Sequence, residues 1–280
     1  MPPKFLENQP NIFYKSLLFI ARSNIFISVC AASLAAWSQQ LFSAKITFAN
    51  AWITLGATFI MYNTQQLYLE YVSVKNTSLF KPWIKKNTNL LRIVVLIAAA
   101  EIYPLQKSEP PLLITYALAA AISLLYFMPF SNLRSIPFLK SLIIGLVWGL
   151  VCVIAPLETS SFNKMELIFC FSQLFLITAL CVLFNIRDVD DDKKTKTYTV
   201  PVLYGIKNAK IFAIVLLTGY LIANVFVAPV FYFIFISSLI FVISCAFTFK
   251  SYPKNHPLYY LFGVDGIILL QSVLGLLFLW

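Results

Sequence analysis

Long apolar runs separated by short polar segments follow one another along the whole chain. Nine such runs are present, and they cover residues 24–41, 48–70, 90–106, 111–129, 139–157, 166–186, 209–228, 230–248 and 257–280. A helix of about 20 apolar residues crosses the roughly 30 Å hydrocarbon layer of a bilayer. The pattern therefore predicts an all-α integral membrane protein, a bundle of nine transmembrane helices that forms one polytopic domain over residues 1–280.

Composition supports this prediction and limits the alternatives. The chain is 60% hydrophobic and has a mean hydropathy of +0.82. Both values are higher than the buried core of a soluble protein requires. The connecting segments are short, so they leave no room for a separate soluble domain. An amphipathic lead-in from Ile12 to Ile20 precedes the first span, and no small-residue cleavage site follows it, so we do not interpret the N-terminal region as a cleaved signal peptide.

The charge is strongly asymmetric across the nine predicted spans. With alternating spans, 18 of the 21 Lys and Arg residues fall on one side, and only Lys45, Lys107 and Lys164 fall on the other. The positive-inside rule then predicts a cytoplasmic N-terminus and an external C-terminus, in the plasma (inner) membrane if the source is prokaryotic. The basic charge attracts anionic lipid head groups, and a nucleic-acid partner is excluded because no soluble basic domain exists to bind one.

All five cysteines lie inside spans, and their spacing matches neither a zinc site nor a disulfide framework, so we expect packing roles for all five.

The two longest cytoplasmic loops, near 71–89 and 187–208, follow the second and sixth spans. Functional side chains concentrate on loops that a rigid scaffold holds, which directs attention to the cytoplasmic face.

The loop after the sixth span begins with a dense acidic cluster. Asp188, Asp190, Asp191 and Asp192 are four of the chain's 11 acidic residues and lie within five positions. Carboxylates this close repel one another unless a cation neutralises them, and Mg²⁺ shares carboxylate oxygens with substrate phosphates. The cluster indicates metal-assisted binding of a phosphorylated, membrane-soluble substrate; the alternative is a solvated acidic turn balanced by the lysines that follow it. Arg187 is expected to pair with these carboxylates.

This cluster resembles the second Asp-rich motif of the UbiA superfamily of intramembrane prenyltransferases. Asp188 and Asp192 match its D-x-x-x-D pattern, and residues 199–205, with Thr199, Pro201 and Gly205, match the T-x-P-x-x-x-G element that follows. The resemblance implies a nine-helix UbiA-like bundle in which Mg²⁺ is held on an isoprenyl diphosphate. Departure of the diphosphate would leave an allylic cation that alkylates a lipophilic, often aromatic, acceptor.

The first Asp-rich motif of that superfamily has a divergent counterpart near the end of the second span. Asn63, Gln66 and Glu70 keep the motif's spacing, but amides replace two carboxylates. The resemblance gives Glu70, with Asp188 and Asp192, the catalytic and metal-binding role, and it gives Asn63 and Gln66 a substrate-binding role. The alternative is that these polar residues only cap the interfacial end of a helix.

Residues before the fifth span resemble a third element of the superfamily. Tyr126, Arg134 and Lys140 would bind substrate there, Arg134 and Lys140 through the diphosphate oxygens. Plain positive-inside bias explains the two basic residues equally well. Asp265, within the ninth span, is either functional or paired with Arg22 at similar depth.

Together the sequence favours a Mg²⁺-dependent intramembrane prenyltransferase that acts on an isoprenyl diphosphate and a lipophilic or aromatic acceptor. The alternative is a divergent, non-catalytic UbiA-like protein that binds a polyprenyl lipid or a membrane partner, so the sequence leaves enzymatic activity open. It also leaves open the acceptor, the donor chain length, and the oligomeric state.

Overall fold

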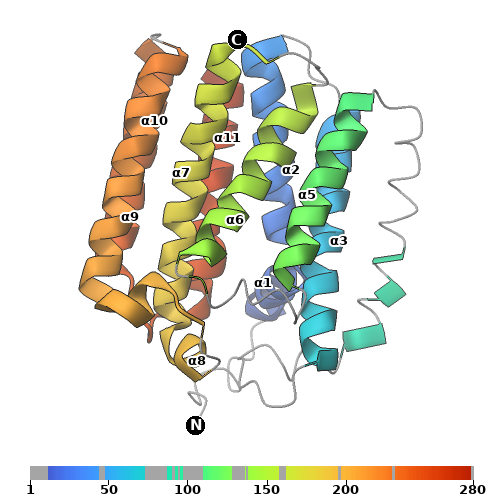
Figure 1. The fold of residues 1–280 in the computed structure, drawn as a ribbon, viewed down its shortest axis with the longest axis vertical. Coiled ribbons are helices and arrows are strands. Elements are labelled where there is room, and N and C mark those ends of the chain that lie inside the picture. The colour runs from blue at the N-terminus through green and yellow to red at the C-terminus, as the bar shows by residue number, and fades with distance from the viewer. Residues whose placement is uncertain are drawn as a thin grey trace.

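The computed structural model of the chain describes residues 12–43, 48–72, 87–89, 92–93, 95–96, 110–127, 136, 138–157, 162–194, 197–228 and 231–278. All regular structure in these ranges is helical, as the apolar runs predict. Most of the helices run side by side along the long axis of the molecule (Figure 1). In chain order they are α1 (Ile12–Arg22), α2 (Ile25–Ser43), α3 (Phe48–Val72), α5 (Pro110–Phe127), α6 (Leu139–Gly149), η4 (Leu150–Ile154), η5 (Ala155–Leu157), α7 (Lys164–Arg187), α8 (Val189–Lys194), α9 (Val200–Val227), α10 (Phe231–Lys250), η6 (Tyr259–Val264) and α11 (Asp265–Phe278).

Six helical segments in the described part of the chain are long and apolar enough to cross a membrane. They are Ile25–Phe42, Leu139–Leu157, Lys164–Arg187, Val200–Val227, Phe231–Lys250 and Tyr259–Phe278. The prediction of an all-helical integral membrane protein is therefore confirmed. The third predicted span, 90–106, lies largely outside the described residues, and the count of nine stays a prediction.

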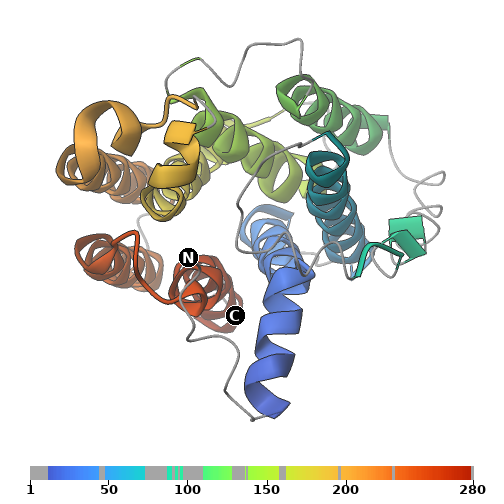
Figure 2. The ribbon, with the colours of Figure 1, turned by 90° about the horizontal axis from the view of Figure 1, so that it is seen from below.

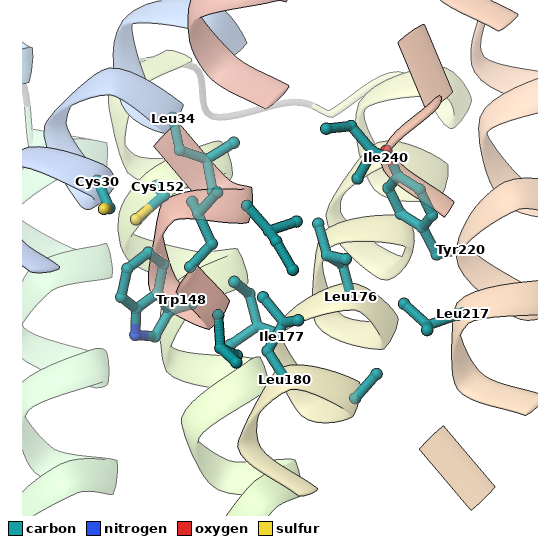
Figure 3. Packing of buried hydrophobic residues seen from close by; sticks show 14 of the residues in the cluster. Cys30, Leu34, Trp148, Cys152, Leu176, Ile177, Leu180, Leu217, Tyr220 and Ile240 are labelled. Carbon is teal, nitrogen blue, oxygen red and sulfur yellow. The ribbon is translucent and has the colours of Figure 1, made fainter. Parts of the chain in front are cut away.

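The helices are arranged in a ring when the bundle is seen along its axis (Figure 2). α2 packs on α3 and α11, α7 packs on α6 and α9, and α10 lies between α9 and α11. A buried apolar cluster joins α7 to its neighbours, with Leu176, Ile177, Leu180, Leu217, Tyr220 and Ile240 among its members (Figure 3). α7 is thus a central element of the packed core.

A glycine sets the close approach of α6 to α7. A Cβ atom at Gly145 would lie 2.9 Å from the carbonyl oxygen of Leu174 and would also collide with Thr178. Nearer the start of α6, Asn185 of α7 donates a 2.8 Å hydrogen bond to Ser141 Oγ. These contacts fix the beginning of α6 against the end of α7, where the acidic cluster begins.

Three residues of the described chain have positive φ and lie near the same end of the bundle: Asn24, Gly205 and Phe138, which precedes α6 with φ 66°. Asn24, between α1 and α2, has φ 61°, a conformation that asparagine tolerates better than most residues. Gly205 interrupts α9 with φ 79° and ψ 164°, a region that is almost exclusive to glycine. The glycine of the T-x-P-x-x-x-G element is therefore the point at which α9 bends.

Candidate functional site

The acidic cluster forms the junction between α7 and α8. Arg187 is the last residue of α7, and it donates hydrogen bonds of 2.7 Å from Nε and 2.9 Å from Nη2 to the two carboxylate oxygens of Asp188. Burial alone would raise the pKa of Asp188, but the charge and hydrogen bonds of Arg187 outweigh burial, so this pKa lies below its usual value. The predicted pairing of Arg187 with the cluster is confirmed.

Asp192 lies one turn after Asp188 and is more deeply buried. Lys140 Nζ lies 3.2 and 3.4 Å from its two carboxylate oxygens, and Thr199 Oγ1 donates a 3.1 Å hydrogen bond to Oδ2. Burial raises the pKa of Asp192 above its usual value, against the opposing charge of Lys140. The structure thus brings together two predicted site residues, Lys140 and Asp192, and gives the threonine of the T-x-P element a direct role in holding them.

The divergent first motif forms a cluster of side-chain amides. Asn63 is fully buried; its Nδ2 donates to the carbonyl oxygens of Ser23 at 3.1 Å and Phe59 at 2.9 Å. Its Oδ1 accepts from Asn24 Nδ2 at 3.2 Å, and Gln66 Nε2 donates to Asn24 Oδ1 at 3.3 Å. The amide of Asn63 therefore ties α3 to the turn between α1 and α2, and Gln66 is the more accessible member of the cluster.

The remaining predicted site residues are only partly described. Tyr126 is buried near the end of α5. Glu70 belongs to α3, but its side chain lies outside the described residues, as does all of Arg134. The predicted convergence of Glu70 with Asp192 therefore stays a prediction.

Sequence reasoning missed Asn24. Asn24 belongs to no recognisable motif. In the sequence it is only a polar residue between two apolar segments, a pattern that also fits an ordinary turn. Whether Asp265 is functional or pairs with Arg22 stays a prediction. The Arg187 guanidinium lies 4.8 Å from the centre of the Phe184 ring and 5.7 Å from that of Tyr260.

An apolar cavity of about 240 Å³ lies between α3, α5 and the α6–η4 segment. Its wall is formed by Ala57, Thr58, Ile60, Met61, Tyr62, Tyr116, Ala119, Ala120, Ser123, Val147, Trp148, Val151 and Cys152. Trp148 Nε1 donates a 3.2 Å hydrogen bond to Tyr62 Oη across it. The cavity offers room for a hydrocarbon group and few groups that could bind anything charged.

The acidic cluster meets some of the requirements of a magnesium site. Asp188 and Asp192 supply hard oxygen ligands of the kind that Mg²⁺ prefers, and the 2.8 Å hydrogen bond from Asp192 N to Asp188 O places them one helical turn apart. Within the described residues, however, no group of three or more His, Cys, Asp or Glu side chains gathers around one point. Asp188 and Asp192 are the two carboxylates of the motif, and each is neutralised by a neighbouring basic side chain.

No protein-family model and no curated protein matches the sequence. The fold, by contrast, is similar to that of several solved structures. A UbiA homologue from Archaeoglobus fulgidus, bound to GPP and Mg²⁺, superposes with a TM-score of 0.68 at 15% sequence identity, covering 92% of this chain and 98% of that one. A UbiA homologue from Aeropyrum pernix K1 gives a TM-score of 0.62 at 15% identity, over 90% and 95% of the two chains.

A digeranylgeranylglyceryl phosphate synthase has a TM-score of 0.55 at 15% identity, over 94% of this chain and 96% of that one. These similarities extend over almost the whole length of each protein. The chain therefore has the UbiA fold.

Proposed function

We propose that this protein is an intramembrane prenyltransferase that transfers an isoprenyl group from a diphosphate donor to a lipophilic or aromatic acceptor. One observation supports this most: within a UbiA fold, a paired basic and acidic site at Lys140 and Asp192 lies at the same end of the bundle as the amide cluster. The similar A. fulgidus protein has been solved with GPP and with DMAPP, each together with Mg²⁺.

Each predicted site residue has a role in this proposal. Asp188 and Asp192, with Glu70, hold Mg²⁺, which when bound supplies positive charge that stabilises the departing diphosphate. Lys140, Arg134 and Gln66 bind and orient the diphosphate, and Tyr126 closes the site from α5. Asn63, whose amide hydrogen-bonds the α1–α2 turn, would hold Asn24, and through it Gln66, in position.

The charges already present shape how such a site would operate. Lys140 and Arg187 neutralise the acidic pair in the described structure, so the carboxylates do not repel each other before ligands arrive. A diphosphate brings the negative charge that would draw Lys140 away from Asp192 and leave its oxygens for a metal. Lys140 would thereby pair with Asp192 in the absence of ligand and with the diphosphate when it is bound.

The proposal also includes nine transmembrane helices, a cytoplasmic N-terminus and an external C-terminus. The acidic and amide clusters then face the cytoplasm, where soluble Mg²⁺ is available and pyrophosphate can leave. The lipophilic acceptor and the donor chain would come from the surrounding membrane.

The decisive experiment measures Mg²⁺-dependent release of pyrophosphate from isoprenyl diphosphates by the purified protein in lipid nanodiscs. Asp188→Asn and Asp192→Asn should each lower the rate by at least about 100-fold, a loss of roughly 3 kcal/mol of transition-state stabilisation. Asp190→Asn is the matched control, because Asp190 is an exposed carboxylate of the same short helix, and it should keep near-normal activity.

Equal loss in all three variants, or no pyrophosphate release by the wild-type protein with any lipophilic acceptor, would contradict the catalytic proposal. Binding of an isoprenyl diphosphate without turnover would instead support a non-catalytic lipid-binding protein.

A further inference from the structure

The cavity between α3, α5 and α6–η4 lies next to the proposed diphosphate site, on the side away from α8. All three helices that line it also carry proposed site residues farther along, towards the end of the bundle that holds α8 (Figure 1). Gln66 follows the lining residue Tyr62 by one turn, Tyr126 follows Ser123 by one turn, and Lys140 precedes Val147 by two turns. A chain attached to a diphosphate at Lys140 and Gln66 would therefore extend into this cavity.

Packed side chains lie at the opposite end of the cavity. Tyr116 lines the cavity and shares a 2.7 Å hydrogen bond with Thr54 of α3. Behind Tyr116 lies a small buried cluster formed by Ile53, Leu112 and Ala155, one residue from each of α3, α5 and η5. The floor of the cavity is thus formed by an aromatic ring that a hydrogen bond and an apolar cluster both hold.

The backbone behind this floor is also fixed. The carbonyl oxygen of Pro156, in η5, accepts hydrogen bonds from Gln39 Nε2 at 2.9 Å and from Asn50 Nδ2 at 3.2 Å. All three residues are buried or nearly so, and together they join α2, α3 and η5 just beyond the floor cluster. Deepening the cavity beyond the ring of Tyr116 would require breaking these buried hydrogen bonds, which is unfavourable because buried polar groups would be left unsatisfied.

The size of the cavity sets how much hydrocarbon it can hold. An apolar protein cavity of about 150 Å³ accommodates benzene, with its six carbon atoms. By proportion, a cavity of about 240 Å³ accommodates about ten carbon atoms. This corresponds to two isoprene units.

We propose that this cavity holds the hydrocarbon chain of the donor and limits it to two isoprene units, with Tyr116 as the residue that sets the limit. The proposal rests on the proposed function, because it assumes an isoprenyl diphosphate as the ligand. The UbiA fold by itself does not determine the length of the donor chain. The proposal specifies this length, because a deeper cavity would admit longer chains.

The test measures binding of a graded series of ligands to the full-length protein in lipid nanodiscs with Mg²⁺. The series comprises inorganic pyrophosphate and dimethylallyl, geranyl, farnesyl and geranylgeranyl diphosphate, with empty nanodiscs to correct for partition into lipid. For the wild-type protein, affinity should rise on the order of 100-fold from dimethylallyl to geranyl diphosphate, as one more unit enters the cavity. It should then fall by at least about tenfold for farnesyl diphosphate, because the added unit meets the floor.

Three variants locate the limit. Tyr116→Ala should move the tightest binding to farnesyl diphosphate, and Tyr116→Phe should keep the wild-type preference because the ring remains. Ala120→Leu, which adds bulk to the cavity wall, should lower the affinity for geranyl diphosphate to that for dimethylallyl diphosphate. Leu118→Ala is the matched control, because Leu118 lies on the same helix and is half exposed; it should change nothing in the series.

The outcomes separate this inference from the proposed function. If the wild-type protein binds farnesyl and geranylgeranyl diphosphate as tightly as geranyl diphosphate, the chain-length limit is wrong, while the proposed function stands. The limit is equally wrong if Ala120→Leu binds geranyl diphosphate with wild-type affinity, a readout that does not depend on how well Tyr116→Ala folds. If no member of the series binds, the proposed function itself is overturned.

Discussion

At the scale of single residues, Asn63 shows how an amide at a divergent motif position can be a structural requirement. Its Nδ2 donates to two backbone carbonyl oxygens, those of Ser23 and Phe59, and the side chain is fully buried. An aspartate at this position would restore the superfamily's motif, but its carboxylate has no hydrogen to donate to either carbonyl. We expect Asn63→Asp to destabilise the protein by about 1–3 kcal/mol, the usual cost of buried groups that lose their partners.

The measurement is the thermal unfolding midpoint in detergent, with Asn208→Asp as the control. Asn208 Nδ2 likewise donates to the carbonyl oxygen four residues before it, that of Tyr204, at 2.9 Å, but this side chain is exposed, so a carboxylate there should be tolerated. An Asn63→Asp protein as stable as wild type would mean that the amide network contributes little to the fold.

The residues of the acidic site could be chosen from the sequence, but their partners could not. The D-x-x-x-D and T-x-P patterns identified Asp188, Asp192 and Thr199, and the basic residue Lys140 was selected as a diphosphate ligand. The ion pair between Lys140 and Asp192 joins positions 52 residues apart in sequence, and only the packing of α6 on α7 brings them together. Asn24 was not predicted as part of the site because a single polar residue between two apolar segments does not indicate which helix it will contact.

At the scale of helices, the close contact between α6 and α7 holds the two halves of the candidate site together. Gly145 permits it, since a Cβ atom there would lie 2.9 Å from Leu174 O and collide with Thr178. We expect Gly145→Ala to push the helices apart, lower the unfolding midpoint, and weaken diphosphate binding because Lys140 moves away from Asp192. Overpacking of this kind typically costs about 1–3 kcal/mol.

Gly266→Ala is the matched control for this prediction. Gly266 is also helical, but the nearest atom to its added Cβ would be 3.8 Å away, in Phe26, which is ordinary contact. Unfolding midpoints and diphosphate affinities of the two variants should therefore diverge. Equal behaviour would show that the α6–α7 spacing is not tightly constrained.

Helix positions were largely predictable because apolar runs of this length have few other structures available in a membrane. The predicted 139–157 span corresponds to α6, η4 and η5 in sequence, but the change within it to π-helical geometry was not predictable. A π-helix closes its hydrogen bonds over five residues, and no composition signal marks where that begins. This segment contributes Val151 and Cys152 to the cavity wall, so the irregular part of the helix also shapes the cavity.

At the scale of the whole molecule, the directions of the described helices constrain how often the chain crosses the membrane. Ile53, Leu112 and Ala155 pack together; the first two lie near the starts of α3 and α5, and the third lies beyond the end of α6. α3 and α5 therefore run in the same direction, and α6 runs in the opposite one. From Ile53 to Val72, α3 advances by about 28 Å, so the chain between Val72 and Pro110 must recross that distance before α5 begins.

This return favours a further span at residues 90–106 and hence a nine-span topology with its termini on opposite sides of the membrane. The charge split of 18 basic residues to three then orients the protein by the positive-inside rule. A reporter fused after Trp280 should be external, one inserted in the 75–86 segment should be cytoplasmic, and one inserted at 107–109 should be external. An internal reporter at 107–109 together with an internal C-terminus would indicate eight spans, and inverted signals at all three positions would show that the basic side faces outward. The eight-span result would place the acidic cluster outside and leave the amide cluster inside, and the inverted result would place both clusters outside. In either case Asp188 and Asp192 would lie outside the compartment in which the proposed reaction obtains its metal.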